Sequence, residues 1–337
     1  MLVIGCHCRV PGFGAGYFGV DLFFVLSGFL ITQLLVGELD ARGTLDLSGF
    51  YLRRFLRLAP PLCLLLAAYV AVGPWAWPQF KLWQHFRDAG LTGFYLSDYA
   101  RAFWNDPRVL MHTWSLSVEE HFYLIWPFAI LLLARIAPRW RLAGLAGIYL
   151  LATGWRIFEY EHLNWAETYF RFDTHMSGLI SGALLALCVS QIGRISEERA
   201  NAIGLLACAA LVSCLATSFW HAPWALVWMM TLAETAAVGL LVAASVQGTW
   251  VNMVLSVRPL VAAGMVSYGL YLWHYPVAVF FRDLLPWYQT VPIVLVIAFA
   301  AAAVSYLAVE RPLQRYRRNL GDRRRQVDAT AKPATIA

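Results

Sequence analysis

The sequence has few charged residues for its length. Asp, Glu, Lys and Arg make up 14% of its 337 residues, whereas 60% are hydrophobic; a soluble domain normally carries about 25% charged residues. The mean hydropathy is +0.59. A single water-soluble fold would have no way to hide so much apolar surface, so the composition excludes it and predicts a protein that lies in a lipid bilayer.

Paired cysteines and a set of metal ligands are also missing. The six cysteines are scattered, mostly in apolar runs, and do not have the spacing of a disulfide framework. Cys6-His7-Cys8 is compact, but no second pair of Cys or His follows at the spacing of a metal site. We therefore expect no bound metal. A secretory signal is not recognisable either, because the first apolar stretch is short and has no small-residue cleavage site.

What the sequence does contain is a series of apolar runs, each close to the roughly 20 residues that cross a bilayer as a helix. Residues 1–8 look like the end of a further helix that Met1 cuts short. The pattern predicts an all-α, polytopic transmembrane helix bundle of about ten helices, the first incomplete. We expect one membrane domain over residues 1–320 and a disordered basic cytoplasmic tail over 321–337. The nine complete runs cover residues 17–37, 56–77, 114–134, 142–158, 169–190, 201–218, 224–246, 261–281 and 290–309.

Basic residues are distributed unevenly between the two sides of these runs. With alternating loops, 18 of the 26 lysines and arginines fall on the side that holds the loop after residue 37 and the C-terminal tail. The positive-inside rule makes this the cytoplasmic side, here of a bacterial-type inner membrane. The basic residues behind the net charge of +6 then anchor the protein to anionic lipid, and we expect no nucleic-acid partner.

Ionisable side chains inside the apolar runs are candidates for function, because burying them in lipid is costly. A neutral imidazole at His7 can take a proton from a hydroxyl; the alternative is a histidine satisfied by a neighbouring helix. Arg54 and Arg57 share a helix face at the cytoplasmic end, where they suit the phosphates of a coenzyme or lipid headgroup. Spacing alone favours ordinary anchoring for this pair.

Two weaker candidates lie further along the chain. The carboxylate of Glu119, beside Tyr123, suits the orientation of an imidazole or the binding of acceptor hydroxyls; the alternative is a solvated acidic helix start. His274 is flanked by aromatic residues, and the alternative there is an aromatic interface belt.

Six stretches together resemble the acyltransferase-3 family of integral membrane O-acyltransferases, in the family's order and over nearly the whole chain. The resemblance implies about ten membrane helices with both ends cytoplasmic. It also implies transfer of an acyl group, commonly acetyl, from acetyl-CoA or another acyl-CoA to a carbohydrate or glycolipid outside the cytoplasm. The stretches are GVDLFFVLSGFLIT at 19–32, FYLRRFLRLAP at 50–60, HTWSLSVEEHFYLIWP at 112–127, YFRFDTHMSGLISGALLA at 169–186, SYGLYLWHYPV at 267–277 and ERPL at 310–313.

The same resemblance implies roles for individual residues. His7 matches the family's essential first-helix histidine, Arg54 and Arg57 match its RxxR pair, and Glu119 and Tyr123 belong to its ExxFY motif. One departure is serious: the arginine usually found eleven residues before the histidine would fall upstream of Met1. Either the true start lies upstream or the chain is a truncated copy. The chain also ends soon after ERPL, without the esterase-like domain that some members add, so we expect a single-domain member.

These observations combine into one hypothesis. The phosphates of the acyl-CoA donor dock near Arg54 and Arg57, and His7 activates either the acceptor hydroxyl or a relay nucleophile. Asp21 or Glu119 orients the imidazole, as the third member of a triad does. We expect no tightly bound cofactor, and the sequence leaves the oligomeric state open. Further motif positions are expected to stabilise the oxyanion, bind substrate or support the site: Ser27, Tyr123, Arg171, Asp173 and His274.

Two alternatives remain at this stage. A non-enzymatic transporter would be expected to have two symmetry-related halves with interrupted helices, and the sequence has no such matching halves. An inactive, truncated paralogue is the other alternative, because half of the first helix is missing.

Overall fold

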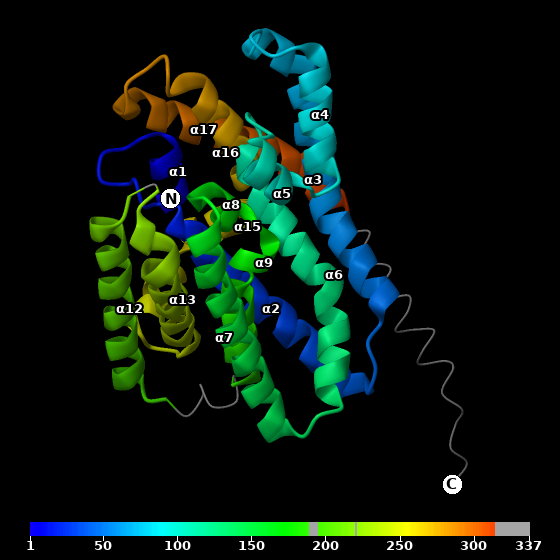
Figure 1. Cartoon of the computed structure of the whole chain (residues 1–337), viewed down its shortest axis with the longest axis vertical. Helices are drawn as coiled ribbons and strands as arrows, with labels where there is room; N and C mark the ends of the chain where they lie inside the picture. Colours follow the sequence, from blue (N-terminus) through cyan, green and yellow to red (C-terminus); the bar gives the residue numbers. More distant parts are fainter. Residues whose placement is uncertain (189–194, 220, 314–337) are drawn as a thin grey trace.

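The computed structural model describes residues 1–188, 195–219 and 221–313. The described residues form a bundle of helices without strands (Figure 1). The prediction of an all-α, polytopic membrane bundle is therefore confirmed. The tail predicted over 321–337 lies outside the described residues.

Six helical stretches in the described part of the chain are long and apolar enough to cross a membrane. They are α2 (Phe18–Arg42), α3 (Leu47–Ala76), η1 with α6 (Met111–Ala134), α12 (Glu197–Thr217), η2 with α13 (Ala225–Ser245) and α17 with the turn that follows it (Trp287–Leu313). The other helices are α1 (Leu2–His7), α4 (Leu82–Gly93), α5 (Ser97–Trp104), α7 (Pro138–His162), α8 (Trp165–Phe170), α9 (Phe172–His175), α10 (Ser177–Leu187), α14 (Trp250–Leu255), α15 (Arg258–Met265) and α16 (Ser267–Phe281).

Two predicted spans are interrupted in the structure. The run 169–190 begins in the short helices α8 and α9 and continues as α10, because Arg171 between α8 and α9 adopts an extended backbone conformation. The run 261–281 is divided into α15 and α16, which meet at Val266. Apolar composition predicted the presence of helix in both runs but not the breaks, where the backbone at Arg171 and Val266 departs from helical geometry.

Helix α2 runs through the middle of the bundle and packs against α6, α10 and α13 (Figure 1). Its crossing with α10 is very close: a side chain at Gly28 would clash with the backbone oxygen of Leu179, and one at Gly182 with that of Val25. Small residues allow this approach between membrane helices. The close crossing helps to fix the position of polar residues in the N-terminal half of α2.

The outside of the bundle is covered with apolar side chains. Leu30 and Leu34 on α2, Leu124 on α6 and Leu151 on α7 are all exposed, Leu151 to 75%. Such a surface is stable in lipid and not in water, so the chain is an integral membrane protein. Segment 78–113 contains α4 and α5, and α5 packs on α6 and α8.

Candidate active site

Three histidines from separate helices meet beside α16, and we call them the histidine cluster: His7 of α1, His112 of η1 and His274 of α16. His7 Nδ1 lies 2.9 Å from His274 Nε2. The rings of His7 and His274 are stacked, with centroids 5.2 Å apart, and His112 meets His274 edge-on at 5.6 Å. His112 and His274 are buried, whereas His7 is half-buried. His7 is thus the most accessible of the three side chains.

The position of His112 follows from a proline in α16. Pro276 has no backbone N–H, so the carbonyl of Leu272, four residues earlier, lacks its helical donor. His112 Nε2 lies 3.1 Å from that oxygen and supplies the missing hydrogen bond. Because a carbonyl only accepts, the hydrogen of His112 sits on Nε2. Its Nδ1 is buried and has no hydrogen-bond partner in the described residues.

One face of α6 connects the histidine cluster to a second polar group. Ser115, Glu119 and Tyr123 are spaced four residues apart and so lie on the same face. Ser115 Oγ is 2.5 Å from the Tyr271 hydroxyl, which donates to the carbonyl of His112 at 2.7 Å. From Ser115 to Tyr123 this face extends about 12 Å along the helix.

At the far end of this face lies the carboxylate–arginine cluster: Ser27 of α2, Arg54 of α3, and Glu119, Glu120 and Tyr123 of α6. The hydroxyls of Ser27 and Tyr123 both hydrogen-bond Glu119. The guanidinium of Arg54 lies over the ring of Tyr123, 3.7 Å from Glu119 Oε1 and 3.4 Å from Glu120 Oε1. The structure therefore brings together Ser27, Arg54, Glu119 and Tyr123, which the sequence singled out.

The two arginines of the RxxR pair have different surroundings. The side chain of Arg54 is only 12% exposed and shares its charge with Glu119 and Glu120. Arg57, one turn later, is exposed and interacts electrostatically with Glu310 near the end of α17. Arg57 is therefore the more accessible of the two cations for an anionic ligand.

Asp21, proposed as an orienting group for His7, contacts another histidine. Its Oδ1 lies 3.0 Å from His175 Nε2, and both side chains are fully buried. His175 Nδ1 lies 2.6 Å from the carbonyl oxygen of Tyr169. Both nitrogens of this imidazole are thus engaged. Neither Asp21 nor Glu119 contacts His7 in the structure. The side chain that lies within hydrogen-bond distance of the His7 imidazole is that of His274.

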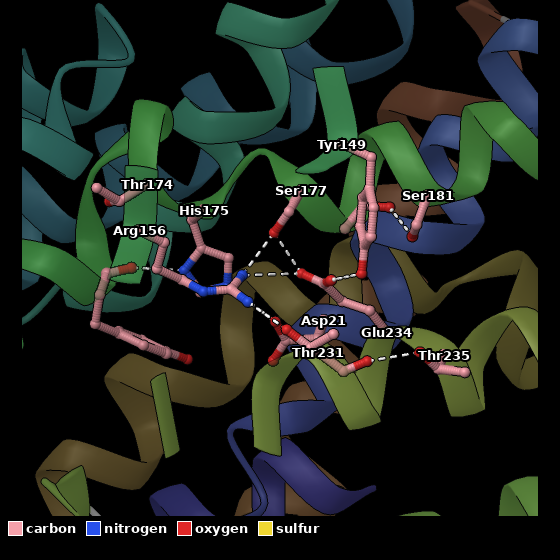
Figure 2. A network of polar contacts seen from close by, with 12 residues as sticks. Asp21, Tyr149, Arg156, Thr174, His175, Ser177, Ser181, Thr231, Glu234 and Thr235 are labelled. Atoms are coloured by element: carbon pink, nitrogen blue, oxygen red, sulfur yellow. Dashed lines mark hydrogen bonds and ion pairs between the residues drawn. The ribbon is translucent and has the colours of Figure 1, made fainter. Parts of the chain in front are cut away.

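A third buried group surrounds an ion pair between α7 and α13 (Figure 2). Arg156 Nη1 is 3.2 Å from Glu234 Oε1, and both side chains are 0% exposed. Ser177 accepts from Arg156 at 2.6 Å and donates to Glu234 at 2.5 Å. Thr231 accepts from Arg156 at 2.7 Å, and Tyr149 donates to Glu234 at 3.0 Å. We call these five residues the arginine–glutamate network.

Arg171 and Asp173 lie apart from the histidine cluster, in a polar group near the C-terminal end of α7. Arg171 binds Asp173 and, at 2.6 Å, Glu159. Asp173 also accepts from Trp155 at 2.8 Å and from Tyr99 at 3.3 Å. Burial, with Asp173 and Asp98 adding to it, raises the pKa of Tyr99 to about 12. These contacts join α5, α7 and α9.

Sequence reasoning missed two residues that the structure makes prominent. Arg156 lies inside the predicted run 142–158. A charged side chain in an apolar run is costly to bury, so this position could have marked Arg156 as a candidate functional residue. His112 is the first residue of the motif at 112–127, but the sequence analysis did not consider it as a candidate. Its role depends on Pro276, 164 positions later in the chain, and pattern along the chain does not reveal such a pairing.

A family model described as an acyltransferase domain, that of the acyltransferase-3 family, matches residues 1–310. The chain therefore belongs to the acyltransferase-3 family.

Two curated relatives are similar to the chain. Peptidoglycan O-acetyltransferase OatA of Listeria monocytogenes is 30% identical over 293 residues, which cover 82% of this chain and 47% of the relative. O-acetyltransferase OatA of Staphylococcus aureus is 30% identical over 335 residues, covering 93% of this chain and 55% of the relative. The chain spans about half the length of the curated relatives it matches. No solved structure matches it.

Proposed function

We propose that the chain is a membrane O-acetyltransferase that moves an acetyl group from acetyl-CoA, or another acyl group from its acyl-CoA, to a hydroxyl of a cell-wall carbohydrate. The observation that carries the proposal is the placement of His7 in a chain of this family. His7 is half-buried against His274, at one end of a polar face that reaches Arg54. His7 at one end of this face suits the acceptor hydroxyl, and the cationic pair Arg54 and Arg57 at the other end suits the phosphates of the donor. The two substrates would then approach from opposite sides.

The overall reaction balances with the groups present. His7 Nε2 takes the proton of the acceptor hydroxyl as its oxygen attacks the thioester carbonyl. The carbon–sulfur bond then breaks, and the leaving thiolate takes the proton from the imidazolium to become the free thiol of the coenzyme. The products are an O-acyl ester and free coenzyme, and His7 returns to its neutral form.

The donor side is proposed to be cytoplasmic. The uneven distribution of Lys and Arg supports this orientation, in a bacterial inner membrane with the C-terminus inside. Arg57 is exposed and would contact the anionic part of acyl-CoA, since guanidinium groups bind phosphates well. Arg54, paired with Glu119 and Glu120, would instead shape the path that leads from Arg57 toward the histidine cluster.

For the acceptor we propose peptidoglycan. The support is the printed name of the Listeria monocytogenes relative, a peptidoglycan O-acetyltransferase. A glycolipid acceptor would have the same reacting hydroxyl chemistry. The two differ in where the ester is found, in the cell wall or in the lipid fraction.

The test is transfer of labelled acetyl groups. Membranes that contain the chain and purified peptidoglycan receive acetyl-CoA labelled in the acetyl group, with His7→Ala as the matched control. We expect alkali-labile label in peptidoglycan and release of free thiol from the wild type, and neither from the variant. Equal labelling by both proteins, or none by well-expressed wild type, would refute the proposal. Label in the lipid fraction alone would refute the peptidoglycan acceptor.

A further inference from the structure

The hydrogens on the paired imidazoles of His7 and His274 can be assigned from their partners. His274 Nδ1 lies 2.7 Å from the carbonyl oxygen of Tyr271. A carbonyl oxygen only accepts hydrogen bonds, so His274 Nδ1 carries a hydrogen. In neutral His274 the other ring nitrogen, Nε2, is then a bare acceptor.

This assignment determines the tautomer of His7. His7 Nδ1 lies 2.9 Å from His274 Nε2, and one of these two atoms must donate. Since His274 Nε2 is bare, the donor is His7 Nδ1–H. Neutral His7 therefore presents its lone pair at Nε2. Within the described part of the chain, His7 Nε2 has no hydrogen-bond partner, so this lone pair is available to a substrate.

We infer that His274 is a positioning residue that holds His7 in its reactive tautomer. By accepting from Nδ1–H it does for His7 what the aspartate of a Ser-His-Asp triad does for its histidine, with a neutral ring in place of a carboxylate. The inference rests on the proposed function, in which His7 is the base. It assigns His274 a role in the orientation of the base and no contact with the reacting atoms.

The contact between the two rings also suits the change of charge during the reaction. When His7 takes a proton at Nε2, it carries hydrogens on both nitrogens, and Nδ1 continues to donate to His274. The ring therefore need not rotate between the neutral and the protonated state. A ring orientation that is the same in both protonation states suits a base that must take up a proton and then return it.

Packing keeps both rings in this arrangement. The planes of His7 and His274 differ by only 13°, and the edge of Tyr275 meets His7 at a centroid distance of 4.5 Å. Arg282 donates to the backbone oxygen of His7 at 3.3 Å. His274 is 1% exposed, so water has little access to its Nε2. A rotated His7 would lose its hydrogen bond to His274.

Three substitutions at one position separate the hydrogen bond from packing. The amide oxygen of glutamine reaches about as far from the backbone as imidazole Nε2, whereas that of asparagine reaches only as far as Nδ1. His274→Gln therefore keeps an acceptor for His7 Nδ1–H, and His274→Asn and His274→Ala do not. Initial rates are measured with labelled acetyl-CoA and peptidoglycan over a range of pH, and thermal unfolding in detergent confirms that each variant is folded.

We expect His274→Gln to keep kcat within about tenfold of wild type, and the other two variants to lose about a hundredfold or more. The KM for acetyl-CoA should not change, because His274 does not contact the donor. Lowering the pH should reduce the activity of wild type and His274→Gln in parallel. Equal rates for the glutamine and alanine variants would overturn the role of His274.

A second measurement does not depend on activity. The chain, labelled with ¹⁵N-histidine and placed in lipid nanodiscs, gives nitrogen shifts that distinguish the two neutral tautomers, and His7→Ala identifies the signal of His7. We expect the Nδ1–H form in wild type and His274→Gln, and a mixture in His274→Ala. An Nε2–H form in wild type would overturn the inference. The expected tautomer in a wild type that transfers no acetyl would refute the proposed function alone.

Discussion

Two histidines inside the helix bundle, His7 and His175, differ in how many of their ring nitrogens have a hydrogen-bond partner. Both nitrogens of His175 are occupied, one by the carbonyl of Tyr169 and the other by Asp21. His7 uses only Nδ1, toward His274, and keeps Nε2 for a substrate. A buried titratable group in a membrane is costly in either case. What separates His7 from His175 is an unpaired ring nitrogen on a side chain that is not fully buried.

Whole networks differ less sharply than these two histidines. In the arginine–glutamate network each oxygen of Glu234 and both terminal nitrogens of Arg156 have a partner (Figure 2), whereas Arg156 Nε is buried without one among the described residues. The backbone oxygen of Asp21 and the side chain of Glu234 both lie close to Gly178, so this network and the Asp21–His175 pair adjoin. We interpret them together as the polar contact that joins α2, α7, α10 and α13. In the histidine cluster, by comparison, two imidazole nitrogens remain unpaired.

The largest expected effect compares the two histidines directly. His7→Ala should lower acetyl transfer by about 10²–10⁴-fold, because it removes the proposed base, and should leave thermal unfolding almost unchanged. His175→Ala should lower stability, because Asp21 is left buried without its partner, while the folded fraction keeps turnover within about tenfold. Radiolabel transfer and thermal unfolding in detergent measure the two effects. Loss of turnover in a fully folded His175→Ala variant would place the Asp21–His175 pair in the reaction.

Breaking the ion pair should cost stability next. Arg156→Met leaves Glu234 buried without its cation and should lower the free energy of unfolding by about 3–5 kcal/mol. Adding Glu234→Met removes the stranded charge, and the double variant should recover most of the loss. Denaturant unfolding in micelles measures both variants. A double variant as unstable as the single one would show that the pair does more than neutralise its own charge.

The contact between His112 and Leu272 gives a smaller prediction. His112→Phe keeps a ring against Tyr275 but leaves the carbonyl of Leu272 without a donor, which should cost about 1–3 kcal/mol of unfolding free energy. Pro276→Ala restores a backbone N–H at the position that helical geometry pairs with this carbonyl. The double variant should therefore be more stable than His112→Phe, as measured by thermal unfolding. No recovery would mean that Pro276 is not the reason for the contact.

The smallest effect is expected at the RxxR pair. Arg57→Gln should raise the KM for acetyl-CoA by about tenfold with little change in kcat or stability, because an exposed cation that binds phosphate contributes to ground-state binding. Arg54→Gln should lower kcat and stability as well, since Glu119 and Glu120 lose their cation. Steady-state kinetics over acetyl-CoA concentration separate the two. Identical profiles would mean that the arginines act as one site.

The sequence was sufficient to predict the class of fold, because the length of an apolar run depends on local composition. It also nominated candidate residues, through ionisable side chains in apolar runs and through the family resemblance. It paired Asp21 or Glu119 with His7 and so missed His274 as the partner. The reason is physical: α1, η1 and α16 are far apart in sequence, and only their packing decides which polar atoms meet. The breaks before α10 and α16 were missed for a similar reason, since apolar content continues through them.

The most direct test of the account is chemical modification of the histidines in the folded chain in membranes. Diethyl pyrocarbonate reacts with a bare nitrogen of a neutral imidazole, and peptide mass spectrometry locates each modified ring. The account predicts that His7 is modified, that acetyl transfer is lost at the same rate, and that His175 stays unmodified until the chain is unfolded. Modification of His175 as fast as His7, or of His7 without loss of transfer, would contradict it.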